Sequence, residues 1–106
     1  MAAANEAAPM TPLNPPEINV RHNADQSRFE ATVEGHLAVA EYVLDGQQMT
    51  FTHTLVPPEL RGRGLAEKLV RAGLAEARAQ QRRVVPACSY VAAFIERHPE
   101  FKDLLA

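Results

Sequence analysis

The chain of 106 residues has little of what several classes of protein depend on. A single cysteine cannot form an internal disulfide, and closely spaced Cys/His pairs do not occur, so we expect neither a disulfide framework nor a metal site. The formal net charge of -2 and the pI near 6.1 argue against binding to nucleic acid. No stretch approaches the roughly 18 apolar residues of a membrane span. We therefore predict a cytoplasmic protein with no nucleic-acid or membrane partner.

The start of the chain differs in composition from the rest. Residues 1–16 (MAAANEAAPMTPLNPP) are rich in alanine and proline, and they lack both the basic start of a secretory signal and the arginines of a transit peptide. We interpret them as a flexible tail. The remaining length, residues 17–106, suffices for a single domain with one modest core, which we expect to be a monomer or a weak dimer.

The first part of this domain has the pattern of strands separated by turns. In RFEATVEG, apolar side chains at Phe29, Ala31 and Val33 alternate with polar ones, which is the period of a half-buried strand. The pair Asp45-Gly46 is a strong signal for a type I′ hairpin turn, because both central positions of that turn need positive φ. We predict an antiparallel meander built from residues 18–23, 28–35, 36–46 and 47–56.

The last of these segments, QQMTFTHTLV, divides its side chains between two faces. Strict alternation places His53 on the same face as Phe51 and Leu55, and it places the threonines on the other face. We therefore expect the ring of His53 to share the face of Phe51.

After this meander the apolar period changes from two to about 3.6 residues. Residues 64–80 carry an apolar stripe opposite charged residues and should form an amphipathic helix. Gly73 lies in the stripe, where it costs up to about 1 kcal/mol of helix propensity relative to alanine, so close packing on a sheet is its expected role. RRVVPACS predicts a short buried strand parallel to the one ending at Val56, joined by a right-handed crossover. A second helix should open near Ser89, as its N-cap, and stop at Pro99.

The junction between strand and helix, PPELRGRGLAEKLV, is rich in glycine and arginine. The first turn of a helix leaves backbone N–H groups unpaired and carries roughly half a positive charge. Gly62 and Gly64 remove the β-carbons that would keep a phosphate from these amides, and Arg61 and Arg63 add mobile positive charge. These residues favour an anion cradle. The alternative is an ordinary turn with solvated arginines.

The same residues resemble a known family. RGRGLA fits the R/Q-x-x-G-x-G/A signature of the GNAT N-acetyltransferase superfamily, with Arg61, Gly64 and Ala66 on its defining positions. HTLVPPELRGRGLAEKLV, followed by VVPACSYVAAFIERHPEF, resembles the short, single-domain YjdJ-like branch, in which a C-S-Y-V segment ends the second parallel strand. The resemblance covers residues 28–102. It implies an α/β (α+β) fold with an antiparallel meander, a β-α-β unit with splayed parallel strands, and a C-terminal helix.

In such proteins the bound anion is the pyrophosphate of coenzyme A, whose acetyl form is the acyl donor. The pantetheine arm enters a gap between the two parallel strands and bonds to the first of them, here near Leu55 and Val56. Pro86 supplies a reason for the gap, because it has no N–H to donate to a sheet ladder. The resemblance places the pyrophosphate on backbone amides of the loop residues Arg61, Gly62, Arg63, Gly64, Leu65 and Ala66.

The thioester of acetyl-CoA would then lie near Cys88, Ser89 and Tyr90. Cys88 stands just before a predicted helix N-terminus, where the dipole lowers a thiol pKa. The alternatives for Cys88 are a nucleophile that accepts the acetyl group, a group placed beside the thioester, and a packed core thiol. Tyr90 either protonates the departing thiolate, as a tyrosine does in many relatives, or packs.

Direct attack by the acceptor amine is the usual route in this family, and it needs a base. His53 is the best-placed candidate, and Glu41 on the neighbouring strand is a weaker one. The alternative for His53 is a ring packed under the sheet or bonded to backbone. The other histidines have no evident constellation around them, and we assign them to the surface or to caps: His22, His36 and His98.

We therefore predict an acetyl-CoA-dependent N-acetyltransferase that acts on a primary amine of a small molecule, a peptide or a protein. A chain this short lacks the insertions with which larger relatives enclose small molecules, which favours an open acceptor side and a protein or peptide amine. The alternatives are a CoA-binding module with little or no catalysis and a plain protein-interaction domain.

Overall fold

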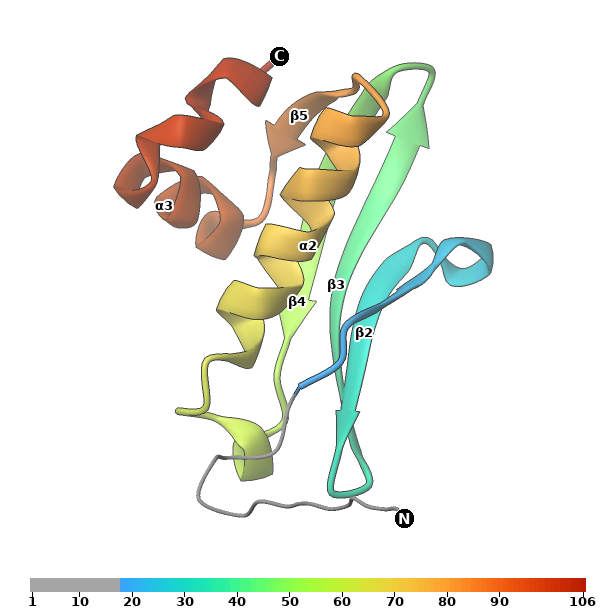
Figure 1. The fold of residues 1–106 in the computed structure, drawn as a ribbon, viewed down its shortest axis with the longest axis vertical. Coiled ribbons are helices and arrows are strands. Elements are labelled where there is room, and N and C mark those ends of the chain that lie inside the picture. The colour runs from blue at the N-terminus through green and yellow to red at the C-terminus, as the bar shows by residue number, and fades with distance from the viewer. Residues whose placement is uncertain (1–17) are drawn as a thin grey trace, which may run out of the picture.

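The computed structural model describes residues 18–106, and the predicted tail of residues 1–16 lies outside them. The strands are β1 (Arg21–Asn23), β2 (Arg28–Val33), β3 (His36–Asp45), β4 (Gln48–Leu55) and β5 (Arg83–Pro86), and the helices are α2 (Leu65–Ala79) and α3 (Ser89–Arg97), with short 3-10 helices at Ala24–Gln26, Pro58–Leu60 and Pro99–Leu104. The strands form one sheet in the order β1-β2-β3-β4-β5 (Figure 1). Neighbours are antiparallel from β1 to β4, and β5 runs parallel to β4. This arrangement confirms the predicted fold class.

Most predicted elements are present with shifted ends. β1 is shorter than predicted and has only three residues. α2 begins one residue after, and ends one residue before, the predicted bounds 64–80. The N-cap of α3 is Cys88 rather than Ser89, which is the first helical residue instead. The 3-10 helix at Pro99–Leu104 was not predicted, because a short helix of that type produces no sustained apolar period.

The hairpin turns differ from the prediction. The β3–β4 turn is centred on Gly46 and Gln47, one residue later than the predicted pair Asp45-Gly46. Of these two residues only Gly46 has a positive φ, at 61°. A type II′ turn requires a positive φ at its first central position alone, whereas a type I′ turn requires it at both. Positive φ at both central positions occurs instead at Glu34 and Gly35, with 53° and 80°, in the β2–β3 turn that the pattern had assigned to strand.

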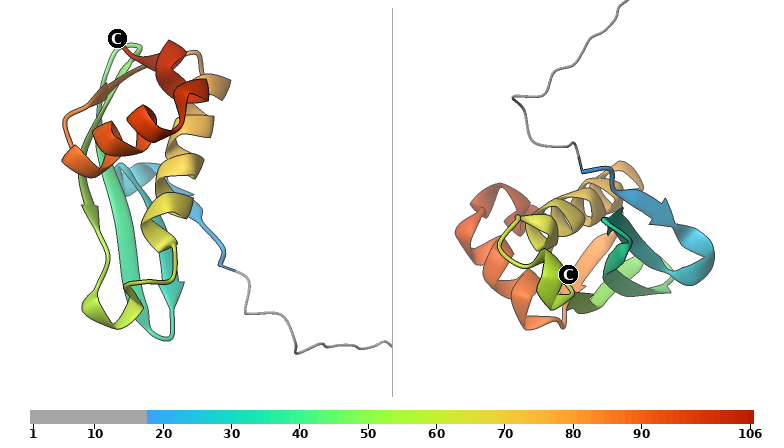
Figure 2. Two further views of the ribbon diagram at one scale, coloured as in Figure 1. Left: turned by 90° about the vertical axis from the view of Figure 1, so that its left-hand side faces the viewer. Right: turned by 90° about the horizontal axis from the view of Figure 1, so that it is seen from below.

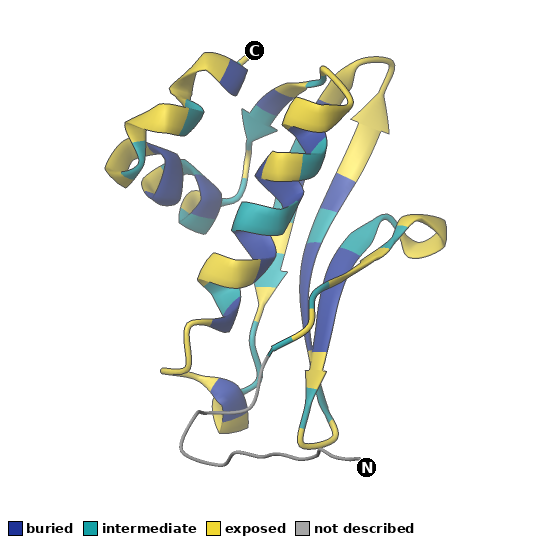
Figure 3. Ribbon diagram, in the orientation of Figure 1, coloured by how far each residue is buried: buried dark blue, intermediate teal, exposed yellow. Residues whose placement is uncertain are grey.

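Both helices pack on one face of the sheet (Figure 2). Their apolar stripes and this face share one hydrophobic core, with Phe51, Leu74 and Phe94 among its buried side chains. The opposite face carries exposed side chains such as Val43 and Leu55, and no helix of the described residues covers it. Figure 3 shows the end of β3 next to the β3–β4 turn as exposed and the middle of β3 as buried. None of the helices in residues 18–106 combines the length and the hydropathy that crossing a bilayer requires.

Helix α2 approaches the sheet closely at Gly73. A β-carbon at this position would lie 2.7 Å from Cε1 and 2.9 Å from Cζ of Phe51. Both distances are shorter than van der Waals contact, so any larger residue would push the helix or the ring aside. The predicted role of this glycine in close packing is confirmed.

Replacing Gly73 with alanine should lower the stability of the fold. The added methyl group overpacks the contact with Phe51 at a cost of about 1–3 kcal/mol, which exceeds the gain of up to about 1 kcal/mol in helix propensity. Urea denaturation should therefore show a lower midpoint. Ala75→Gly, on the exposed side of the same helix, measures propensity alone. A Phe51→Leu background should relieve the penalty, and a Gly73→Ala variant more stable than the wild type would contradict close packing.

Candidate functional site

Pairing between β4 and β5 ends halfway along β4. The last pair joins Phe51 to Pro86, and the N–H of Cys88 then donates to the carbonyl of Phe51 at 2.8 Å. From Thr52 to Leu55, β4 has no strand beside it on this side within the described residues. Pro86 ends β5, in line with its missing N–H. The two strands therefore part and leave a backbone edge of β4 open to a ligand.

A β-bulge at Thr52 lies where the strands part. Glu41 of β3 faces His53, but the next residue, Tyr42, faces Phe51, so Thr52 is an extra residue without a partner. Its hydroxyl donates to the carbonyl of Glu41 at 3.4 Å. One extra residue moves every later side chain of β4 to the opposite face.

The bulge overturns the predicted facing of His53. Phe51 is buried on the helix side, whereas His53 and Leu55 are exposed on the uncovered face. Thr54 now points to the helix side, where its hydroxyl lies 3.5 Å from the Sγ atom of Cys88. His53 and Cys88 therefore lie on opposite faces of β4.

The loop before α2 offers a row of unpaired backbone donors. Within residues 18–106, none of the amides from Gly62 to Glu67 donates to a protein partner, and the N-cap Gly64 supplies no capping side chain. Gly62 and Gly64 have φ angles of 82° and 76°, which glycine adopts without strain. Apart from each glycine and its two chain neighbours, no atom lies within 4 Å of where the β-carbons would be. An anion can therefore approach these donors directly.

The two arginines of this loop are not mobile charges, contrary to the prediction. Arg63 donates two hydrogen bonds, of 3.0 and 3.1 Å, to Glu34 in the β2–β3 turn. These bonds and the charge of Arg63 hold the pKa of Glu34 below its ordinary value. The Nε of Arg61 donates to the carbonyl of Val56 at 3.2 Å. Glu34 thus connects the loop to the β2–β3 turn, and no sequence motif indicates this contact.

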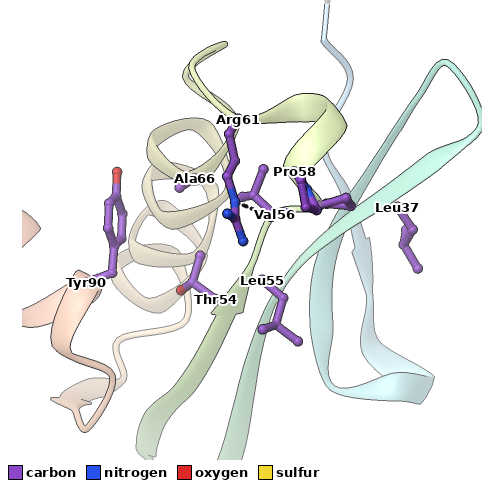
Figure 4. Close-up of a pocket in the computed structure, with 9 residues that line it drawn as sticks. Leu37, Thr54, Leu55, Val56, Pro58, Arg61, Ala66 and Tyr90 are labelled. Carbon is purple, nitrogen blue, oxygen red and sulfur yellow. Dashed lines mark hydrogen bonds between the residues drawn. The ribbon is translucent and has the colours of Figure 1, made fainter.

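Two adjoining clefts lie beside this loop. The larger, about 490 Å³, runs past Leu55 and Val56 at the end of β4, and Tyr90 stands on its other side (Figure 4). The smaller, about 260 Å³, lies against the glycines and the first turn of α2. The structure thus brings together the predicted contacts of β4, the loop and Tyr90. Four of the predicted site residues line neither of these two clefts: His53, Arg63, Cys88 and Ser89.

Cys88 is half-buried at the N-cap of α3. Burial alone would raise the pKa of its thiol, but the Thr54 hydroxyl and the nearby backbone N–H groups of Val91 and Tyr90 favour the thiolate and together outweigh burial. The pKa of Cys88 therefore lies below its ordinary value. The sequence pattern does not indicate a role for Thr54, because its contact with Cys88 depends on the bulge.

Tyr90 stays protonated over a wide pH range. Burial and the negative charge of Glu67 raise the pKa of its hydroxyl, against a smaller opposing effect of Arg97. In Figure 4 the hydroxyl lies level with Ala66, toward the loop, while the base of the ring lies level with Thr54. Tyr90 therefore presents a neutral hydrogen-bond donor at the loop end of the cleft.

His53 and Glu41 form a pair on the uncovered face. The Nδ1 atom of His53 lies 3.7 Å from Oε1 of Glu41, and both side chains are accessible to solvent. His53 is thus neither packed under the sheet nor bonded to backbone within the described residues. The two candidate bases lie together.

The remaining histidines have structural surroundings. His22 stacks on Phe29 at 4.2 Å between ring centroids, and its Nε2 lies 2.6 Å from the hydroxyl of Tyr42. The expectation that His22 has no grouped partners was wrong. Its partners come from other strands, so the sequence around His22 does not indicate them. His98 caps the C-terminus of α3 through a 2.8 Å contact of Nδ1 with a backbone carbonyl, and His36 lies at the surface.

Comparison with known proteins agrees with this geometry. Residues 28–104 match the family described as GCN5-related N-acetyl-transferase. Protein NATD1 of Bos taurus is 30% identical over 96 residues, which cover 88% of this chain and 85% of NATD1. The solution structure of a GCN5-like protein from Staphylococcus aureus shares the fold, with a TM-score of 0.67 and 23% identity over 83% of this chain and 87% of that chain. The chain belongs to the GCN5-related N-acetyltransferase family.

Proposed function

We propose that the protein is an acetyl-CoA-dependent N-acetyltransferase that moves the acetyl group to a primary amine. The observation that carries this proposal is the row of unpaired amides from Gly62 to Glu67, which adjoins a cleft along the free edge of β4. Acetyl-CoA has a diphosphate joined to an amide-bearing arm, so it requires both features in this order.

The residues present fit the phosphate end of acetyl-CoA. The amides at the start of α2 are fixed by the helix, and the helix dipole adds positive potential at the same point. Gly62 and Gly64 leave room for phosphate oxygens. Arg63 remains paired with Glu34, so its contribution is to hold the loop in place.

The residues also fit the arm. Backbone groups of Leu55 and Val56 at the free edge of β4 can pair with the pantetheine amides as an added strand would. Arg61 must first release the carbonyl of Val56. Pro57 and the ring of Tyr90 supply apolar walls.

The acetyl group would then reach the point where β4 and β5 part. We assign His53 as the base that takes a proton from the amine, because its ring is exposed beside this gap. Cys88 lies on the other face, beside the departing sulfur in the direct route or as a carrier of the acetyl group in a covalent route. Tyr90 is a protonated donor whose ring must turn from its present orientation to reach the thiolate.

A CoA-binding module with little catalysis is the second candidate. The observation that favours it is the exposure of His53, which lies near one carboxylate and lacks the tight hydrogen bonds that orient most catalytic bases. Such a module keeps the phosphate cradle and the cleft unchanged.

Replacing Gly64 with glutamate should remove acetyl-CoA binding. The side chain would place a carboxylate at the unpaired amides and repel the diphosphate, weakening binding by at least about tenfold, or 1.4 kcal/mol. Titration calorimetry with acetyl-CoA measures this loss. Gly46→Glu is a matched control, because Gly46 also has positive φ and open space but lies in the β3–β4 turn. Wild-type protein that fails to bind acetyl-CoA at millimolar concentration would reject the proposal.

The thiol of Cys88 should ionise at lower pH than an ordinary cysteine. Its alkylation by iodoacetamide should therefore reach half of the maximal rate at a lower pH than that of a free cysteine in a short peptide. Thr54→Val removes one hydrogen bond to the thiolate and should move this midpoint to higher pH. Thr32→Val, an exposed threonine of β2, is the control. Identical midpoints for both variants would show that Thr54 does not stabilise the thiolate.

Turnover separates the enzyme from the binding module. With a panel of primary amines, His53→Ala should lower kcat by at least about tenfold while acetyl-CoA still binds. A binding module predicts no turnover by the wild type. Intact mass recorded during turnover should show an unmodified Cys88 if transfer is direct, and an added acetyl group on this residue would establish the covalent route instead.

A further inference from the structure

A row of polar side chains crosses the uncovered face of the sheet beside the gap between β4 and β5. Arg28 of β2 faces Glu41 of β3, and Glu41 faces His53 of β4. Neighbouring strands are about 4.8 Å apart, so these residues stand in line across the sheet. The hydroxyl of Thr52 bonds to the carbonyl of Glu41 and holds the row at the bulge. The row ends at the strand edge where the proposed acetyl donor lies.

Glu41 lacks a fixed cation among the described residues. Its only ion-pair contact there is the 3.7 Å approach to His53. Arg28 uses its Nε on Glu30 at 3.1 Å, and Arg21 contacts the same carboxylate at 3.1 Å. An accessible carboxylate without an arginine or lysine is suited to a cation that arrives from outside, such as a primary ammonium group.

We propose that this face is the acceptor site and that Glu41 binds the ammonium group of a lysine side chain carried by an extended peptide. The inference rests on the proposed function. Val43 and Leu55, each 56% exposed, lie on either side of the row and suit the aliphatic stem of lysine. No helix of residues 18–106 closes over this face, so an extended chain can lie across it.

The pair can also carry the proton. The bound ammonium donates one proton to Nε2 of His53, while Glu41 faces Nδ1 and stabilises the imidazolium. The amine nitrogen then bonds to the acetyl carbonyl carbon, and the carbon–sulfur bond to coenzyme A breaks. The departing thiolate takes a proton from Tyr90, and a second proton from the nitrogen restores the Tyr90 hydroxyl, which gives the amide and the free thiol. His53 is exposed and returns its proton to water. Glu41 is thus a binding and positioning residue.

A kinetic experiment tests the role of Glu41. The acceptor is a peptide with blocked termini and one lysine between aliphatic residues. Glu41→Gln should raise its KM by at least about tenfold and lower kcat by less than it raises KM, with acetyl-CoA affinity unchanged. Glu96→Gln is the matched control, because Glu96 forms a similar exposed contact of 3.8 Å with Lys102. An unchanged KM, or better acetylation of spermidine than of the peptide, would overturn the proposal.

Binding measured by NMR separates this site from the proposed function. Titration of 15N-labelled protein with the same peptide, with and without coenzyme A, should shift the amides of Glu41, His53 and Leu55. Glu41→Gln should remove these shifts. Shifts confined to α2 and α3, or no shifts, would overturn the acceptor site even if acetyl-CoA binds. Peptide shifts on this face without any binding of acetyl-CoA would support the site and reject the proposed function alone.

Discussion

The loss of pairing between β4 and β5 after Phe51 is the constraint on which the rest of the site depends. Pro86 has no N–H to continue the ladder, and the N–H of Cys88 donates to the carbonyl of Phe51 just before α3 begins. Four residues of β4, Thr52 to Leu55, therefore keep an open edge on this side, while His53 to Leu55 pair with β3 on the other side. Backbone groups at such an edge need a partner, so the same feature that ends the sheet creates a place for a ligand arm.

The bulge at Thr52 then separates two kinds of chemistry. Before the bulge, Phe51 packs under α2 and belongs to the core. After it, Thr54 turns toward Cys88 on the helix side, and His53 turns outward to join Glu41. An unbulged strand would have put His53 under the helices, away from any acceptor that approaches the open face. In the proposed reaction, this one inserted residue lets a donor on the helix side meet an acceptor from the other side.

Local signals in the sequence predicted the parts of the site that depend on backbone conformation. The glycine spacing at 62 and 64 and the proline at 86 each act on their own neighbours, so the loop and the end of β5 could be predicted without tertiary information. The bulge could not, because period-two alternation does not show where an extra residue enters a strand. The pairing of Glu34 with Arg63 was also missed, since it joins a turn to a loop far along the chain.

The contacts of the two arginines determine how the proposed phosphate cradle would work. Arg63 is committed to Glu34 and Arg61 to the carbonyl of Val56, so neither side chain stands free over the loop. In the proposed complex, attraction for the diphosphate would therefore come first from amides that the helix holds in place, which need no side chain to be ordered on binding. Arg61 can then move its hydrogen bond from the Val56 carbonyl to a phosphate oxygen, because this carbonyl is a single neutral acceptor. Its release also frees the Val56 carbonyl for the arm, which couples the two ends of one ligand through one side chain.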